Sequence, residues 1–489
     1  MASLREKTVT GVIWNLAEQI TVRGISIFVT LLLAYFLSPE DFGLVAMITV
    51  FINIATALMD SGFKQALIKL PDAEQVDFNT AFYANIILGF VAYLLLFFTA
   101  PIISDFYAEE RLTALIRVAG LVVIINVFQV VQYACLSRAL NFRVQFRAAL
   151  PASIISALVA IAMAYSGFGV WALIAQMLVS AAMVIIFLWW QYLWRPTLSW
   201  SLTSLKSMYQ FGYKLFLADL LDVVFRNLYV VVIAKTFSVS IAGLYFFADK
   251  IKELLILRVV TSIQNVTYPA LVKVGSSDGK LKSGYKKLII FTSFALSPLV
   301  LFLAGLAEPL FILLLADKWL PASHYLQLMC IAGVLIPMHA LNLNILKVKG
   351  RSDLSLIIEI VKKILLVAIL VVSINYGVTG ILYGQIISSI LALGLNSYFS
   401  GVLISYRLEE QLVDFIPNIM LSGLIAYMLY EVYKLQIFNE LVIVFLFGPL
   451  AILVYLVSSF VLKLEGLRIC SDILSNNLNK KFRGSKNNG

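Results

Sequence analysis

The segment at residues 243–269 decides how the rest of the chain is interpreted, and its sequence is GLYFFADKIKELLILRVVTSIQNVTYP. It is long and apolar enough to cross a bilayer, because about 20 helical residues span the hydrocarbon. A charge at the centre of such a helix costs roughly 2.5 to 3.5 kcal/mol on insertion scales. The segment nevertheless carries five charged residues, Asp249, Lys250, Lys252, Glu253 and Arg258, and polar residues that include Thr261, Gln264 and Asn265. We therefore expect this helix to face protein or water instead of lipid.

Two interpretations of this helix remain open. At 100° per residue, five of its polar residues share one arc of about 120°, although two leucines lie in the same arc. The five residues are Lys250, Arg258, Thr261, Gln264 and Asn265. The helix is either buried in a bundle with its charges paired internally, or it forms the wall of a polar transport path. The polar arc favours the second interpretation.

Composition defines the class of protein. Of the 489 residues, 61% are hydrophobic and 13% are charged, whereas soluble domains carry about 25% charged residues. The chain is therefore expected to be a polytopic membrane protein. Its three cysteines stand singly and it has two histidines, His324 and His339, so neither a disulfide framework nor a zinc or haem centre is expected, and we predict no cofactor.

Apolar windows separated by polar turns predict an all-α fold of about fourteen transmembrane helices. The first window is interrupted by Glu18 and Arg23 and has no small-residue cleavage site, so it is interpreted as a retained span and not as a signal peptide. The predicted spans are residues 11–37, 42–61, 80–103, 112–136, 147–166, 169–191, 209–235, 241–269, 286–307, 322–346, 354–375, 378–404, 412–431 and 440–462.

The lysines and arginines predict the orientation of these spans. With residues at the span ends counted in the adjoining loops, 24 of the 37 basic residues lie at the two termini and in the even-numbered loops. Four lie in the odd-numbered loops and nine lie within spans. Because basic residues are retained on the cytoplasmic side, we expect both termini to be cytoplasmic. The net charge of +10 is then explained by inner loops that face anionic lipid, and we expect no nucleic-acid partner.

A weak internal repeat has an offset near 200 residues. Leu37-Ser38 followed by Gly43-Leu44 recurs as Phe237-Ser238 followed by Gly243-Leu244. Because the offset covers six spans, the repeat predicts two pseudo-symmetric six-helix lobes of one orientation. The predicted domains are residues 1–208 for spans 1 to 6, 209–404 for spans 7 to 12, 405–463 for two extra spans, and 464–489 for a cytoplasmic tail.

Polar stripes follow the spans that would surround a cavity between two such lobes. Each stripe occupies about 60° to 80° of helical arc. The stripes are Asn15, Gln19, Arg23, Ser26 and Thr30 with Glu18 beside them, then Thr49, Asn53, Thr56 and Asp60, then Asp219, Asp222, Arg226 and Tyr229. Charges three or four residues apart, such as Asp222 with Arg226 or Glu359 with Lys362 and Lys363, could equally neutralise each other within one helix. For any single charge the two interpretations stay open.

Several short motifs along the chain resemble those of Wzx-type polysaccharide exporters. They are Arg5-Glu6-Lys7-Thr8, Leu37-Ser38-Pro39-Glu40-Asp41-Phe42-Gly43-Leu44, Asp60-Ser61-Gly62-Phe63, Tyr268-Pro269-Ala270-Leu271, Asp317-Lys318-Trp319 and Leu326-Gln327-Leu328. The resemblance extends over essentially the whole chain. Within the multidrug/oligosaccharidyl-lipid/polysaccharide flippase superfamily, the chain is most similar to the colanic-acid-exporter branch.

This resemblance implies a transporter and not an enzyme. It implies a bacterial inner-membrane flippase that moves undecaprenyl-diphosphate-linked oligosaccharide repeat units from the cytoplasmic to the periplasmic leaflet by alternating access. Such transport serves surface polysaccharide biosynthesis, with the polymerase and export machinery as further partners. In related lipid II flippases, arginines of spans 1 and 8 line the cavity, and Arg23 and Arg258 occupy comparable spans here.

The polar residues then divide into two sets of candidates. Arginine suits a diphosphate because its guanidinium makes bidentate contacts, whereas carboxylates suit H⁺ or Na⁺ coupling or orient the cations. The candidate substrate-binding residues are Asn15, Gln19, Arg23, Asn53, Arg226, Lys250, Arg258 and Gln264. The candidates for ion coupling are Glu18, Asp60, Asp219, Asp222, Asp249 and Glu253.

Two other classes of protein compete with the flippase as explanations of the sequence. A multidrug or small-cation antiporter of the same superfamily would carry acidic stripes without surplus basic residues, but nine basic residues lie within the predicted spans. A membrane enzyme such as a sugar polymerase would need a large loop or a cluster of carboxylates and histidines, and neither is present in the sequence. The antiporter is the alternative that we retain.

The distribution of basic residues predicts the result of reporter fusions. A reporter fused at Lys282 or in the C-terminal tail should be cytoplasmic, and one fused near Glu109 should be periplasmic. The measurement is paired phosphatase and fluorescent-protein activity at each site. A periplasmic tail would show that the number of spans is odd.

Overall fold

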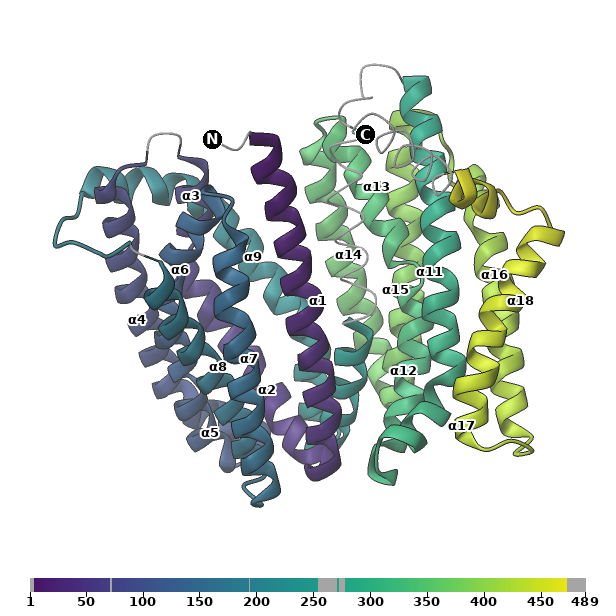
Figure 1. The fold of residues 1–489 in the computed structure, drawn as a ribbon, viewed down its shortest axis with the longest axis horizontal. Helices are drawn as coiled ribbons and strands as arrows, with labels where there is room; N and C mark the ends of the chain where they lie inside the picture. The colour runs from purple at the N-terminus through teal and green to yellow at the C-terminus, as the bar shows by residue number, and fades with distance from the viewer. Residues whose placement is uncertain (1–3, 71–72, 193, 254–270, 272–277, 473–489) are drawn as a thin grey trace, which may run out of the picture. The chain divides into compact units, whose positions relative to one another are not determined.

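The computed structural model describes residues 4–70, 73–192, 194–253, 271 and 278–472, and every regular element in these ranges is a helix. Nine helices of the described residues are long and apolar enough to cross a membrane. They run side by side within each part of the chain (Figure 1). These nine are Pro39–Asp60, Gln75–Tyr107, Arg111–Arg138, Phe142–Tyr165, Val170–Gln191, Gly279–Leu314, Asp317–Val348, Leu408–Lys434 and Glu440–Val461.

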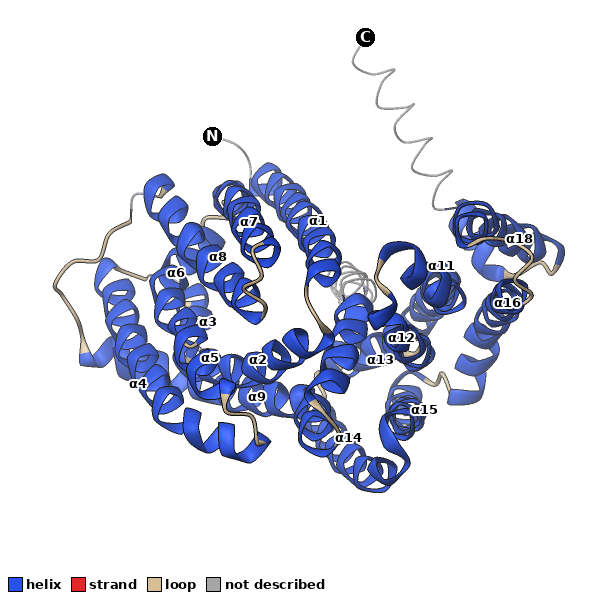
Figure 2. Cartoon of the chain, turned by 90° about the horizontal axis from the view of Figure 1, so that it is seen from below, coloured by secondary structure: helices blue, strands red, loops and turns tan. Residues whose placement is uncertain are grey.

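The chain divides into two compact units, Met1–Phe246 and Phe247–Gly489. The helices of the first unit are α1 (Leu4–Phe36), α2 (Pro39–Asp60), α3 (Phe63–Lys69), α4 (Gln75–Tyr107), α5 (Arg111–Ala119), α6 (Leu121–Arg138), α7 (Phe142–Tyr165), α8 (Val170–Gln191) and α9 (Leu202–Thr236). A further helix begins at residue 239 and is described as far as residue 253. Figure 2 shows the helices of each unit end on.

The second unit is also built from helices alone over its described residues. Its elements are α11 (Asp278–Leu314), η1 (Asp317–Trp319), α12 (Leu320–Gly333), α13 (Ile336–Val348), α14 (Ser352–Ser373), η2 (Ile374–Tyr376), α15 (Gly377–Ile404), α16 (Leu408–Lys434), α17 (Glu440–Val442), η3 (Ile443–Phe447) and α18 (Gly448–Val461). A last short helix occupies residues 465–472.

The repeat seen in the sequence corresponds to two capped helix starts. Ser38 is the N-cap of α2: its hydroxyl accepts from the Asp41 N–H at 3.2 Å, and the Asp41 carboxylate accepts from the Ser38 N–H at 2.9 Å. Ser238 stands in the same place before the helix that begins at residue 239, where its hydroxyl accepts from the Ile241 N–H at 3.2 Å. Both serines satisfy backbone donors that the first turn of a helix leaves without a partner.

The two glycines of the repeat mark a close crossing of these helices inside the first unit. A Cβ added to Gly43 would lie 1.9 Å from the carbonyl oxygen of Val239, and one added to Gly243 would lie 1.7 Å from that of Pro39. The contact is reciprocal. Gly43 lies against Val239 and Gly243 lies against Pro39, and the offset of 200 residues relates Gly43 to Gly243 and Pro39 to Val239. Only glycine allows two helix backbones to approach so closely.

Ion pairs connect the start of α2 to the loop between α4 and α5. The Arg111 guanidinium pairs with the Glu109 carboxylate at 2.6 Å and also with Glu40 in the first turn of α2. This loop lies outside the apolar helices, and the hydrogen bond from Arg111 lowers the pKa of Glu109 below its usual value. The paired carboxylate therefore stays ionised down to lower pH than a free glutamate.

The connection from α8 to α9 is fixed to the start of α4. Asn79 is fully buried, and its amide nitrogen donates to the hydroxyls of Thr197 at 2.6 Å and Ser199 at 2.8 Å. Its amide oxygen accepts from the Thr197 N–H at 3.1 Å. The Thr80 hydroxyl accepts from the Ser201 N–H at 2.9 Å, where α9 is about to begin. One buried side chain thus replaces the backbone partners that this irregular segment lacks.

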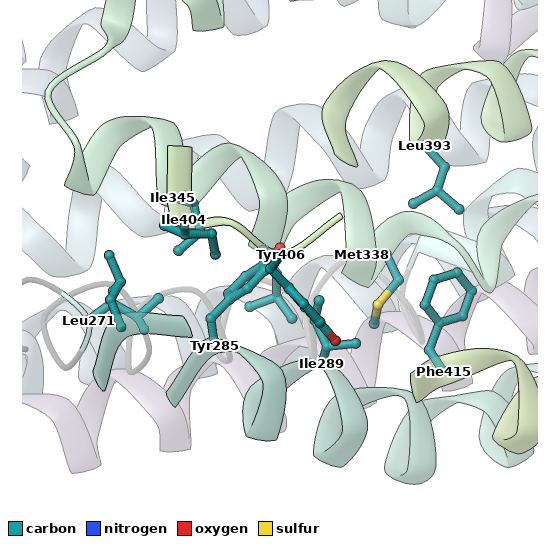
Figure 3. Packing of buried hydrophobic residues seen from close by; sticks show 11 residues of the cluster. Leu271, Tyr285, Ile289, Met338, Ile345, Leu393, Ile404, Tyr406 and Phe415 are labelled. Carbon is teal, nitrogen blue, oxygen red and sulfur yellow. The ribbon is translucent and has the colours of Figure 1, made fainter. Parts of the chain in front are cut away.

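The core of the second unit lies among α11, α13, α15 and α16. Tyr285, Met338 and Phe415 are almost completely buried there, and Figure 3 shows Tyr406 beside Tyr285. Their rings meet edge to face with centroids 5.9 Å apart, an arrangement that aromatic pairs prefer. Trp319 of the Asp317-Lys318-Trp319 motif is completely buried against Phe247 and stabilises the packing of this unit.

The sequence correctly predicted an all-helical, polytopic membrane protein. The count of fourteen spans stays a prediction, because membrane crossing is supported by length and composition for nine helices of the described residues. The repeat-based domain limits also stay predictions. The boundary between the compact units falls between Phe246 and Phe247 in the sequence. The helix α9 belongs to the first unit, because it packs on α2 and α4.

The glycine crossing predicts a stability difference. Gly43→Ala should destabilise the protein by about 1–3 kcal/mol or more, because the new methyl group overlaps a backbone carbonyl that cannot turn aside. Gly24→Ala in α1 is the matched control, since a Cβ there meets nothing within 4 Å, and alanine favours the helix by up to ~1 kcal/mol. Thermal unfolding of both purified variants in detergent measures the difference. Equal midpoints would contradict the crossing.

Candidate functional site

The turn between α2 and α3 positions the first candidate, Asp60. Ser61 and Gly62 both adopt left-handed backbone conformations, with φ of 42° and 77°, and they reverse the chain directly after Asp60. A Cβ on Gly62 would lie 2.6 Å from the carbonyl oxygen of Gly212 in α9, so the turn packs tightly on that helix. The Asp60-Ser61-Gly62-Phe63 motif is therefore a turn that needs glycine and places a carboxylate beside α9.

Asp60 belongs to a group of charged side chains drawn from several helices of the first unit. The backbone N–H of Lys64 donates to its carboxylate, and both the Lys64 ammonium and the Asp219 carboxylate act on it electrostatically. Lys64 Nζ also lies 5.5 Å from the ring centroid of Tyr133 in α6, and Glu18 of α1 acts electrostatically on that tyrosine. We call these five residues, Glu18, Asp60, Lys64, Tyr133 and Asp219, the polar cluster.

The polar cluster contains an unsatisfied acceptor. Asp60 Oδ1 is buried and has no hydrogen-bond partner among the described residues. A buried carboxylate oxygen in this state costs free energy unless a proton, a cation or a donor from a substrate reaches it. The cluster holds three carboxylates and one ammonium, so its charge favours the arrival of a cation or proton.

Further along α9, two candidates form a local ion pair. Arg226 pairs with Asp222 one turn away, and their side chains are 69% and 50% exposed. Asn53 of α2, the helix that packs on α9, is also exposed. The local ion pair between Asp222 and Arg226, which was one of two interpretations of the sequence, is therefore present. Both of its side chains stay exposed. Accessible charges on a membrane helix require water beside them.

The helix at residues 239–253 also contains a local ion pair. Asp249 pairs with Lys252 one turn away, and Lys250 and Glu253 are half-buried. The Asp249–Lys252 pair agrees with internal pairing for these two charges. Glu359 and Lys362 of α14 pair in the same manner, with 2.6 Å between the carboxylate oxygen and Nζ.

Five substrate-binding candidates lie outside the residues or side chains that the structure describes. Arg258 and Gln264 fall in residues 254–270, and the side chains of Asn15, Gln19 and Arg23 fall in the undescribed part of α1. Their roles stay predictions. The structure also adds two residues that the sequence analysis missed, Lys64 and Tyr133. Lys64 follows the Asp60 motif by one residue, and that adjacency was the available signal.

Proteins of known role are similar to this chain over most of its length. It is 25% identical to the lipopolysaccharide biosynthesis protein WzxC of Escherichia coli (strain K12), over 80% of this chain and 81% of the relative. It is 24% identical to the teichuronic acid biosynthesis protein TuaB of Bacillus subtilis (strain 168), over 73% of this chain and 74% of TuaB. It is 25% identical to the succinoglycan biosynthesis transport protein ExoT of Rhizobium meliloti (strain 1021), over 68% of each.

Solved transporter structures have the same fold. The inward closed conformation of the lipid II flippase MurJ matches with a TM-score of 0.68 and 15% identity, and covers 93% of this chain and 99% of its own. An inward-facing multidrug resistance transporter of the MATE family matches with a TM-score of 0.60 and 17% identity, and covers 80% of this chain and 98% of its own. At such identities the likeness concerns the fold alone.

Accessibility of the polar faces of α2 and α9 can be tested with cysteines in a background whose three native cysteines are replaced by alanine. Asn53→Cys and Asp222→Cys should react rapidly with a charged thiol reagent, because a thiolate in contact with water is the reactive species. Val50→Cys, at a side chain 3% exposed, and Phe98→Cys, at one 69% exposed on an apolar helix, should react slowly. Equal rates at all four sites would show that the polar faces do not line an aqueous space.

A family profile described as "Polysaccharide biosynthesis protein" matches residues 32–324, which is more than half of the chain. The match includes the capped start of α2, the glycine crossing and most of the polar cluster. The relatives named for polysaccharide biosynthesis and transport come from bacteria. The chain is therefore a multi-pass bacterial membrane protein that belongs to this polysaccharide biosynthesis family, the Wzx-type flippases that its motifs resemble.

Proposed function

We propose that this protein flips undecaprenyl-diphosphate-linked oligosaccharide repeat units from the cytoplasmic to the periplasmic leaflet of the bacterial inner membrane. Transport proceeds by alternating access and serves surface polysaccharide biosynthesis. Membership of the polysaccharide biosynthesis family supports the class of substrate, and the fold shared with a lipid II flippase supports the class of reaction. The identity of the lipid carrier and the direction of transport are parts of the proposal.

The observation that carries the proposal is the accessible charge on helices of membrane length. The side chain of Arg226 is more than half exposed and that of Asp222 is half exposed. Both lie on α9, a helix of 35 residues. A helix of that length is about 50 Å long and exceeds the thickness of the hydrocarbon. Charges in the middle of such a helix are tolerated where they face a water-filled space. A hydrophilic oligosaccharide needs such a space in order to cross.

The diphosphate requires cations within that space. Arginine binds phosphate oxygens in a bidentate manner, which makes it the suitable residue. Arg23 and Arg258 are proposed as this site, because each lies well inside its span among neutral polar residues. Neither has an acidic residue three or four positions away in the sequence that could neutralise it. Asn15, Gln19, Asn53, Arg226, Lys250 and Gln264 are proposed as further contacts to the sugars and phosphates.

The carboxylates of the polar cluster are proposed to couple transport to an ion. Asp60 Oδ1 is buried and lacks a donor among the described residues, and two other carboxylates lie within electrostatic range of the same cluster. A proton or Na⁺ would relieve both the missing contact and the like-charge repulsion. Asp222, Asp249 and Glu253 are retained as coupling candidates on the neighbouring helices.

The alternative proposal is a multidrug or small-cation antiporter, and the MATE-family fold favours it. An antiporter would use the same carboxylates, but it would bind a lipophilic cation in place of a diphosphate. The two proposals differ in their need for arginine, because a cationic substrate is repelled by Arg23 and Arg258 and an anionic one is attracted.

The flippase proposal predicts that the double variant Arg23→Ala, Arg258→Ala loses transport while its membrane expression is unchanged. Cells carrying it should accumulate undecaprenyl-linked oligosaccharide on the cytoplasmic leaflet, measured by extraction and by the accessibility of the sugar from the periplasm. Replacement of either arginine by lysine keeps the charge but loses the planar fork, so transport should fall only in part.

The control is Arg468→Ala, which removes a basic residue beyond the last predicted span and should leave export normal. Normal export by a well-expressed double alanine variant would reject the diphosphate site. If export were normal and resistance to a lipophilic cation such as ethidium fell, the antiporter would be the better proposal.

A further inference from the structure

The second unit contains a break in one of its membrane helices. The span predicted at residues 322–346 consists of two helices, α12 and α13, separated by Val334 and Leu335. Pro337, which has no N–H to donate, lies in the first turn of α13. A break inside hydrocarbon leaves backbone carbonyls without partners, so the protein must supply donors. Ser389 of α15 does so, because its hydroxyl donates to the Ala332 carbonyl at 3.0 Å.

His339 lies directly after this break and has a polar partner at each ring nitrogen. Its Nε2 lies 3.1 Å from the Ser389 hydroxyl oxygen, and its Nδ1 lies 3.3 Å from the Asn396 amide nitrogen. The Ser389 proton is directed to Ala332, so the Ser389 oxygen accepts from Nε2–H. An amide nitrogen can only donate, so Nδ1 accepts. These contacts define a neutral imidazole with its proton on Nε2.

The surroundings of His339 also contain the group that a protonated imidazole would need. Asn396 is completely buried, and its amide oxygen has no hydrogen-bond partner among the described residues. A proton on Nδ1 would place two donors face to face. If the carboxamide turned over, its oxygen would accept from Nδ1–H, since the two ends of an amide have nearly the same shape. The same three side chains can therefore hold the ring in either protonation state.

A charged pair on the neighbouring helix lies within electrostatic range of this ring. α13 packs against α14 and α15 (Figure 2). The Lys362 ammonium of α14 opposes a positive charge on His339, and Glu359, the partner of Lys362 at 2.6 Å, partly offsets that ammonium. From α15 the ring contacts Ser389 and Asn396, and Ser389 in turn donates to the Ala332 carbonyl of α12. A second cation beside Lys362 would compete for the Glu359 carboxylate, so protonation changes how α13 and α14 attract each other.

We propose that His339, held between Ser389 and Asn396 at the break between α12 and α13, is a proton-binding site that switches the conformation of the second unit during transport. The proton comes from water, binds Nδ1 as the Asn396 carboxamide turns over, and returns to water when the ring is deprotonated again. No other bond forms or breaks. The residue as a whole is half-buried. The link to transport rests on the proposed flippase function, whereas proton binding itself does not.

The site differs from the polar cluster in position and in chemistry. The polar cluster lies in the first unit and uses carboxylates, whereas this site uses an imidazole whose unperturbed titration lies near neutral pH. The break is also a local kink: the Val334 N–H still donates to the Cys330 carbonyl and the His339 N–H to that of Leu335, and kinks are places where one half of a helix can tilt against the other. Protonation at the first turn of α13 can thus be converted into movement of a whole half-helix.

The sequence allows a direct test, because the chain has two histidines. His324→Gln leaves His339 as the one imidazole in protein labelled with ¹⁵N-histidine. At pH 8 its nitrogen signals should be those of a neutral ring protonated on Nε2, and they should move to those of imidazolium as the pH falls. Asn396→Asp should shift this titration to higher pH, since a carboxylate can only accept and its charge favours the cation.

The matched control is Asn418→Asp, which alters another buried asparagine of the same unit that donates to Ser293. It should leave the His339 titration where it is. The inference is overturned if the His339 signals do not change between pH 5 and pH 9 in the folded protein, or if both aspartate variants shift the titration equally. This measurement needs no substrate and stands even if the flippase proposal fails.

A second measurement tests the link to transport. The rate at which lipid-linked oligosaccharide becomes accessible at the periplasmic face should vary with pH in the unmodified protein. In His339→Gln, whose amide keeps a polar contact but does not titrate, the rate should lose that variation. Thermal unfolding checks that the variant is folded. An unchanged pH profile in folded His339→Gln rejects the switch and leaves the flippase proposal intact, whereas an absence of transport in the unmodified protein rejects the flippase proposal.

Discussion

One constraint underlies this structure: inside hydrocarbon, each polar group must find its partner within the protein or in trapped water. Helices satisfy it for most of the backbone, which is why every regular element of the described residues is helical. Where a helix begins or breaks, side chains take over. Ser38 and Ser238 cap two helix starts, and Ser389 satisfies the carbonyl that the break before α13 leaves open.

The same constraint separates charges that are locally paired from charges that gather across helices. Asp222 with Arg226, Asp249 with Lys252 and Glu359 with Lys362 pair within single turns, so the local-pairing interpretation is confirmed for these three. Pairing does not remove a functional role, because the pair on α9 stays accessible and Lys362 of the pair on α14 acts electrostatically on His339. The polar cluster is different, since its members come from five helices and no spacing along one helix could reveal it.

The glycine crossing is a close contact between two helix backbones in the first unit. Gly43 lies against residue 239 and Gly243 lies against residue 39, and these positions correspond across the 200-residue offset of the sequence repeat. A contact built from glycine backbones has no side chains to interlock.

The sequence by itself determined the features that depend on composition and periodicity. Its high hydrophobic content requires a membrane, and its spacing of apolar windows predicts the helices. It also placed Glu18, Asp60 and Asp219 on polar faces, because a helix face follows from 3.6 residues per turn. These signals are local, because each depends on the residues of a single helix.

Only the tertiary structure decided which faces meet. Lys64 and Tyr133 join Asp60 because a left-handed turn folds α3 back and α6 lies beside it. His339, which the sequence showed as an isolated histidine, acquires its partners from α15, about 50 residues away. The physical reason is that hydrogen bonds and charges act over a few ångströms in space, and helix packing brings together residues whose separation along the chain carries no information about their contact.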